Sequence, residues 1–207
     1  MNHKLAPLTG ALFFVVLVAS IVAEGSNTPS SNDSATKVLT YYQDHFRATR
    51  TSGVLTVLAI FLGVIFYGQL RDYLRRSDGV RGLTATAFGG VVLFAASGCL
   101  SAGALFALTD SASHLSPATA QTLSMIRLDV NNGFSNPGLA ILLAGFGLAI
   151  LQSRTLPRWL GWVALPVALI ALIYPISWAA FPLGGLWTLA VSIAMWRRVA
   201  KAEPAVA

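Results

Sequence analysis

Charged side chains are scarce in this chain of 207 residues. Asp, Glu, Lys and Arg together make up 11% of it, whereas they make up about 25% of an average soluble domain. Apolar residues account for 55%, and the mean hydropathy is +0.67. The few charges lie between long apolar runs rather than within them. Because a soluble domain needs a charged surface, the composition indicates an integral membrane protein.

Other absences exclude whole classes of chemistry. Cys99 is the single cysteine, so an internal disulfide is excluded. The chain has no P-loop, HExxH, GxSxG or paired CxxC motif, and we expect no cofactor. No apolar run contains a lysine, which excludes a retinal Schiff base. No charged residue falls in the middle of a predicted span, which argues against an ion-coupled carrier, since such carriers keep an ionisable group there.

The net charge is +6 and the isoelectric point is about 10.0. The basic residues border apolar runs and form no basic face of a soluble domain. We therefore expect anionic lipids at the cytoplasmic face of the bilayer as partners, and no nucleic acid.

Six apolar runs are candidates for transmembrane helices, which need roughly 20 residues each. They cover about residues 5–23, 51–70, 82–108, 137–152, 159–174 and 176–196. The first run also fits a signal peptide. We expect an uncleaved helix, because the run is longer than a usual signal sequence and the bulky Ile21 precedes the candidate cleavage point after Ala23.

Arginines set the predicted orientation, because cytoplasmic loops are enriched in Lys and Arg. The residues that anchor the topology are Arg71, Arg75, Arg76, Arg81, Arg154, Arg158, Arg197 and Arg198. The sequence thus predicts one all-α domain over residues 1–207. It is a bundle of six transmembrane helices, with both termini cytoplasmic and short amphipathic helices in the external segments 24–50 and 109–136.

The external segments carry two helix patterns. Residues 37–50 alternate apolar and polar side chains as an interfacial amphipathic helix does. In the second segment Ser116 and Pro117 predict the start of a helix that extends to Val130. The Asn- and Gly-rich residues 131–138 predict a break before the fourth span. Because that span alone is short, the alternative is an earlier start of the span near Phe134.

Polar residues within the spans are candidates for lining a ligand cavity between the third, fifth and sixth spans. They are Tyr67, Gln69, Ser97, Ser101, Tyr174, Ser177 and Trp178. Hydrogen bonding between helices explains the same residues equally well. A weaker candidate is a metal or acid–base site in the external segments, formed by His45, His114, Asp110 and Asp129. Solvated loops collect such residues too.

The third span is rich in small residues. Ser97 and Ser101, and likewise Gly98 and Ala102, lie four residues apart and so share a helix face. Small residues allow a neighbouring helix to approach closely. We expect a central packing helix here, and an exposed small-residue face would indicate binding to a membrane-protein partner or a second copy.

Three segments carry a resemblance to a known group. They are Phe46-Arg47 through Arg50, Leu70-Arg71 with Leu74-Arg75-Arg76, and Leu156-Pro157-Arg158-Trp159-Leu160-Gly161-Trp162. Their order resembles uncharacterised six-helix membrane proteins of bacteria, many of them actinobacterial, that bear a domain-of-unknown-function label. The resemblance spans most of the chain after Leu39. It implies a bacterial inner membrane and six helices, and it carries over no catalytic residue.

From these observations we expect a non-enzymatic role, as an accessory subunit, a sensor or a binder of lipid or apolar ligands. Two alternatives remain open at this point. One is a transporter for a small molecule or lipid, with its cavity between the third, fifth and sixth spans. The other is an outer-face enzyme or metal site that uses His45 and His114.

Overall fold

The computed structural model describes residues 7–25, 28–30, 32–77, 79–111 and 113–202, with side chains omitted at 131, 132 and 200–202. This part of the chain is helical and contains no strand. The elements are α1 (Leu8–Glu24), α2 (Ala35–Asp44), α3 (Phe46–Leu74), α4 (Arg81–Asp110), α5 (Pro117–Val130), the π-helical turn η1 (Asn131–Ser135), α6 (Asn136–Ser153), α7 (Arg158–Leu172), the 3₁₀ turn η2 (Ser177–Ala179) and α8 (Ala180–Ala202).

Four helical stretches in the described chain are long and apolar enough to cross a membrane. They are Phe46–Leu74, Arg81–Asp110, Pro117–Ser153 and Ser177–Val199. The apolar helices Leu8–Glu24 and Arg158–Leu172 are shorter. At 1.5 Å per residue, the 17 residues of α1 extend about 26 Å, slightly less than the roughly 30 Å of bilayer hydrocarbon. Each of the six predicted runs contains a helix, and four of the runs lie in helical stretches of full spanning length.

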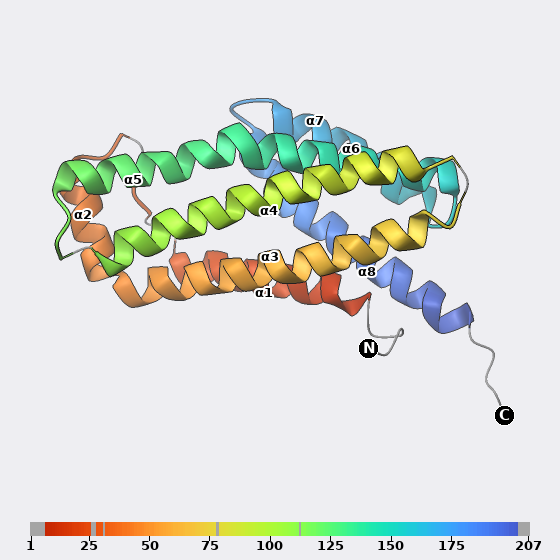
Figure 1. Cartoon of the computed structure of the whole chain (residues 1–207), viewed down its shortest axis with the longest axis horizontal. Coiled ribbons are helices and arrows are strands. Elements are labelled where there is room, and N and C mark those ends of the chain that lie inside the picture. The colour runs from red at the N-terminus through yellow and green to blue at the C-terminus, as the bar shows by residue number, and fades with distance from the viewer. Residues whose placement is uncertain (1–6, 26–27, 31, 78, 112, 203–207) are drawn as a thin grey trace.

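The long helices run roughly along the long axis of the molecule, and α2 lies across one end of it (Figure 1). Helix α1 packs on α3, α4 packs on both α3 and α6, and α7 packs on α6. Helix α8 is tied to its neighbours by polar contacts: the Trp187 indole donates to the Leu160 carbonyl at 2.7 Å, and Ser192 Oγ donates to the Pro7 carbonyl at 2.6 Å.

The bundle has two chemically distinct ends. One, which we call the α2 end, holds α2, the start of α5 and the connection between α4 and α5 (Figure 1). The other, the basic end, holds the connections between α3 and α4 and between α6 and α7, together with the last turns of α8. The eight arginines expected to anchor the topology lie in or beside these connections and turns: Arg71, Arg75, Arg76, Arg81, Arg154, Arg158, Arg197 and Arg198.

Helix α6 is the central helix of the bundle, and it is joined to both neighbours by glycines. A Cβ at Gly90 of α4 would lie 2.5 Å from the Leu142 backbone nitrogen, and one at Gly161 of α7 would lie 2.7 Å from the Gly147 carbonyl oxygen. These backbones therefore touch. The sequence assigned the central position to the third span, α4. Helix α4 does pack on α3, α5 and α6, as expected of a central packing helix, but α6 is the more deeply buried of the two and α4 leaves one face exposed.

The predicted break between α5 and α6 is a π-helical turn, and the helix continues through it. Pro137 has no backbone N–H to donate to an earlier carbonyl. A π turn, in which each N–H bonds five residues back, accommodates such an irregularity without ending the helix. The alternative that the fourth span starts earlier, near Phe134, is the one that agrees with the structure.

The predicted amphipathic helix over 37–50 is shorter than expected. Helix α2 ends at Asp44, and the chain turns at His45 into α3. The residues after the turn therefore belong to the long helix α3. The buried face of α2 consists of Val38, Tyr41 and Tyr42, and it packs with Leu105, Leu108 and Ala120. Helix α2 thus covers protein, where the sequence predicted a helix on the membrane surface.

Candidate functional site

A half-buried ion pair joins α1 to α5 at the α2 end. The Arg127 guanidinium donates to the Glu24 carboxylate, and the two side chains are only 16% and 17% exposed. Glu24 is the last residue of α1, where the helix dipole disfavours a negative charge. Arg127 offsets that repulsion. Asp129, only two residues from Arg127 in the chain, is exposed, and the ion pair observed in the structure is with Glu24.

Three hydroxyl groups complete this cluster. The Tyr42 hydroxyl accepts a hydrogen bond from Arg127 Nη1 at 3.2 Å, and Ser52 Oγ donates to Glu24 Oε2 at 3.5 Å. The Tyr41 hydroxyl donates to the Glu24 carbonyl at 3.1 Å. Burial raises the pKa of Tyr41 above its ordinary value, and the Glu24 carboxylate raises it further. Side chains from α1, α2, α3 and α5 thus meet at one charge pair.

Glu24 was not among the residues predicted to form a site, because it falls at the edge of the external segment 24–50. The available signal was weak: a single acid at the end of an apolar run and a single arginine in the later external segment. A separation of 103 residues in the chain hides the contact from any local pattern.

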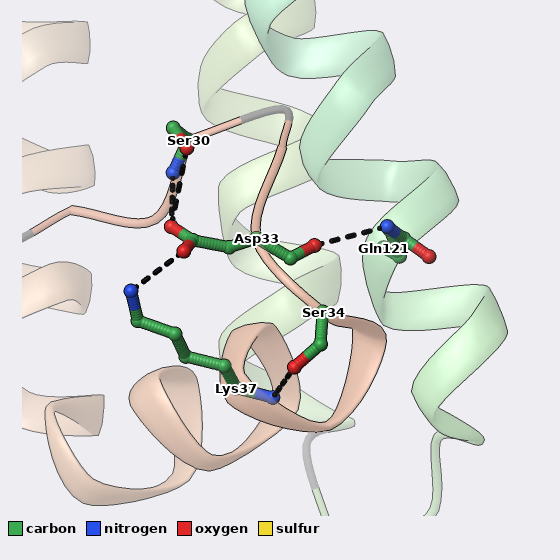
Figure 2. A network of polar contacts seen from close by, with 5 residues as sticks. All are labelled: Ser30, Asp33, Ser34, Lys37 and Gln121. Carbon is green, nitrogen blue, oxygen red and sulfur yellow. Dashed lines mark hydrogen bonds and ion pairs between the residues drawn. The ribbon is translucent and has the colours of Figure 1, made fainter.

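A second polar network fixes the connection between α1 and α2 (Figure 2). The Asp33 carboxylate accepts hydrogen bonds from the Ser30 backbone N–H at 2.8 Å and from Lys37 Nζ at 2.6 Å. These bonds hold the pKa of Asp33 below its ordinary value, with the Lys37 bond as the largest cause. Ser34 caps α2 by accepting from the Lys37 N–H, and Gln121 of α5 donates to the Asp33 carbonyl at 3.1 Å. This connection is thereby tied to both α2 and α5.

The structure does not gather the predicted metal ligands. The His45 ring stacks on Tyr41 with centroids 4.4 Å apart, and Asp110 pairs with Arg50 at 2.8 Å. His114 and Asp129 are exposed. Within the described part of the chain, no group of three or more His, Cys, Asp or Glu side chains is placed to hold a metal ion. The four residues are therefore separate surface groups in this arrangement.

The predicted interior polar residues divide into two sets. Tyr67 and Ser97 are buried and pair across helices: the Tyr67 and Thr188 hydroxyls lie 2.6 Å apart, and so do the Ser97 and Ser135 hydroxyls. The cavity beside Tyr67 has a volume of only about 10 Å³, the space of a single water molecule at most. Interhelical hydrogen bonding, the alternative explanation from the sequence, accounts for both pairs.

The other predicted interior residues do not share one cavity. Tyr174 is 80% exposed and Trp178 is 73% exposed. Contrary to the prediction, neither side chain therefore lines an interior cavity. Both lie in the connection between α7 and α8. Exposed aromatic side chains at the ends of membrane helices are typical of the membrane–water interface. Ser177 is buried and Ser101 is half-buried. Gln69 is half-buried, and its Oε1 has no hydrogen-bond partner in the described chain.

One face of α4 is exposed along its length and made almost wholly of small residues. We call it the α4 stripe; it consists of Ala85, Gly89, Val92, Ala96, Cys99, Gly103 and Ala107. Steps of three and four residues place all of them on one side of the helix. A Cβ at Gly89 or Gly103 would meet nothing within 4 Å. Within the most apolar 18 residues of α4, 28% are buried, which is the lowest share among the four long helical stretches.

The comparisons with known proteins give a family without an assigned activity. Neither the curated proteins nor the solved structures contain a significant match. The family described as "Domain of unknown function (DUF4386)" matches residues 8–200, which include the α4 stripe and all the described helices except the last two residues of α8. The chain therefore belongs to the DUF4386 family, as the resemblance to an uncharacterised domain family predicted.

Proposed function

We propose that this protein is a non-enzymatic membrane subunit that binds another transmembrane helix along the α4 stripe. The stripe is the observation that carries the proposal. Lipid tails are as apolar as leucine, so helices associate in a bilayer mainly through close backbone packing, which small residues permit. Inside this bundle the same chemistry is already used, where Gly90 touches the backbone of α6. The stripe offers an equivalent surface that no described helix covers.

The proposal includes six membrane crossings in the inner membrane of a bacterium, with the basic end in the cytoplasm. Helices α1 and α7 pack along the long helices α3 and α6, which supports their crossing although they are short. The excess of arginine at one end supports its cytoplasmic position.

Photo-crosslinking tests whether another protein contacts the α4 stripe, whatever the identity of that protein. A benzoylphenylalanine is placed at Val92 or Leu100, which are 54% and 61% exposed on or beside the stripe. The matched control positions are Leu169 and Leu172 of α7, which are 62% and 59% exposed. In native membranes we expect protein adducts from the α4 positions and none from the α7 positions. Equal adduct formation at both helices, or none at either, would contradict the proposal.

Cys99 distinguishes a second copy from a different partner. It is exposed on the stripe and is the only cysteine in the chain, so mild oxidation of membranes can join two copies only through this residue. A disulfide-linked dimer of the wild type that is lost in Gly103→Leu, whose side chain would hold the helices apart, indicates self-association. A photo-adduct of another mass without this dimer indicates a different subunit.

The two alternatives have less support. A carrier needs a path through the interior, and the cavity beside Tyr67 holds about 10 Å³, so the helices would have to separate. An outer-face enzyme needs His45 and His114 to act together, whereas the His45 ring is stacked on Tyr41 and its Nδ1 lies 3.0 Å from the Tyr41 carbonyl oxygen.

A further inference from the structure

An apolar groove lies between the start of α7 and the last turns of α8. It encloses about 440 Å³, within the range of roughly 300–1,000 Å³ typical of small-molecule sites. Its walls are apolar along most of their length and it reaches two arginines at the basic end. The lining residues are Pro157, Trp159, Ala190, Ile193, Ala194, Arg197 and Arg198.

The two arginines bring positive charge to this groove. Arg198 donates to the Thr155 carbonyl in the connection between α6 and α7, which holds its guanidinium beside the groove. Both guanidiniums are exposed. No carboxylate of the described chain lies within ion-pairing distance of either one. A guanidinium binds phosphate oxygens through paired N–H groups, which makes arginine a preferred phosphate ligand.

Apolar walls that run to a cationic mouth match the chemistry of a phospholipid. The stretch from Ala190 to Arg197 is about 10 Å along the helix axis, so a headgroup at the arginines would place the upper part of an acyl chain against Ala190, Ile193 and Ala194. Trp159, which lines the groove together with the two arginines, is 55% exposed. Tryptophan is typical of the interface between lipid headgroups and acyl chains.

We propose that the groove between α7 and α8 is a binding site for one anionic phospholipid, with its phosphate on Arg197 and Arg198 and an acyl chain along α8. A free phosphate ion would use the arginines but gain nothing from the apolar walls. A zwitterionic lipid would fill the walls, yet its own cationic group would oppose the arginines. The site rests on the protein being embedded in a membrane, and it is independent of any partner at the α4 stripe.

Native mass spectrometry of the full chain tests the site. The purified protein is mixed with equal amounts of phosphatidylglycerol and phosphatidylcholine in detergent, and the lipid retained after detergent removal is identified. We expect one phosphatidylglycerol to be retained in preference. Arg197→Gln should lower that retention about fivefold, the contribution of one basic residue near an anionic lipid surface. Arg76→Gln, which removes an exposed arginine from the same end but outside the groove, should leave it unchanged.

A second variant tests the apolar wall. Ala194→Phe fills the groove and leaves both arginines in place, so it should also lower the retention of phosphatidylglycerol. Unchanged thermal melting of each variant shows that the fold is intact. Equal retention of the two lipids, an equal loss with Arg76→Gln, or full competition by inorganic phosphate alone would overturn the proposal. Those results would show a diffuse surface charge or a simple anion site.

Discussion

At the scale of single residues, the ion pair formed by Glu24 and Arg127 is expected to stabilise the fold. Arg127→Met would leave the Glu24 carboxylate half-buried at a helix C-terminus without a positive charge to pair with, although Ser52 would still donate a hydrogen bond to it. Removing one partner of a fully buried pair costs about 3–5 kcal/mol, and the remaining exposure of 16–17% lowers our expectation to about 2 kcal/mol. Thermal unfolding in detergent, followed by tryptophan fluorescence, measures the loss.

The control for this prediction is Arg47→Met, which removes an exposed arginine from the same end of the molecule. It should change the unfolding temperature little. The double variant Glu24→Gln with Arg127→Met should recover part of the lost stability, because no charge is then left unpaired. If Arg127→Met and Arg47→Met are equally harmless, the pair contributes no stability and the cluster has another role.

Asp33 gives a prediction about pH. The pKa of Asp33 lies below its ordinary value, which applies to the unfolded chain. A carboxyl group whose pKa is lowered on folding stabilises the folded state above the unfolded pKa, and the stabilisation is lost as the pH falls through the folded pKa. The difference in melting temperature between wild type and Asp33→Asn should therefore be constant from pH 7 to about pH 5 and shrink below about pH 4. A difference that is unchanged down to pH 3 would show that the Asp33 charge is not involved.

At the scale of the helices, the contact between α4 and α6 can be tested with two adjacent glycines. Gly90→Ala would place a Cβ 2.5 Å from the Leu142 backbone nitrogen. Backbone cannot rotate away as a side chain can, so the helices must separate. We expect a loss of about 1–3 kcal/mol, as for other overpacked interiors.

Its neighbour Gly89 is the matched control. A Cβ there meets nothing within 4 Å, and alanine is the better helix former by up to about 1 kcal/mol. Gly89→Ala should be neutral or slightly stabilising in the isolated protein. Similar melting temperatures for the two variants would mean that the close approach at Gly90 is not retained in solution.

The sequence predicted the long apolar helices well and the polar contacts between them poorly. Hydropathy located α3, α4 and α6 to within a few residues. This is because a helix that crosses the bilayer needs a run of predominantly apolar residues, which can be read directly from the sequence. The cap at Ser116 was also correct, since its Oγ accepts from the Thr119 N–H at 3.2 Å. The turn at His45 and the π turn at Asn131–Ser135 are consequences of tertiary packing, and residue patterns did not reveal them.

The candidate sites show the same division. The small residues of the third span were recognised from their spacing, but the face that remains exposed depends on where α3 and α6 pack. Tyr174 and Tyr67 look alike in the sequence as polar aromatics in apolar runs. One is 80% exposed and the other 4%, because only Tyr67 faces a neighbouring helix, where Thr188 meets its hydroxyl.

At the scale of the whole molecule, the division into a basic end and an α2 end predicts how the protein sits in the membrane. Lys and Arg are retained on the cytoplasmic side during insertion. Cysteines introduced into a Cys99→Ala background report the orientation through labelling with a membrane-impermeant maleimide. Thr28→Cys and Ser113→Cys, both exposed at the α2 end, should be labelled in intact cells. Gly79→Cys and Arg154→Cys at the basic end should be labelled only after permeabilisation.

The same experiment determines whether the short helices cross. Helix α1 leads from the basic end to the α2 end (Figure 1), so external labelling at Thr28 combined with a cytoplasmic N-terminal tag requires α1 to span the bilayer. The corresponding pair for α7 is Arg154→Cys, protected in intact cells, and Trp178→Cys, labelled from outside. A short helix can still cross, because the bilayer thins locally around it at a modest energetic cost. Labelling of Thr28 and the N-terminal tag from the same side would exclude a crossing by α1 and reduce the number of spans.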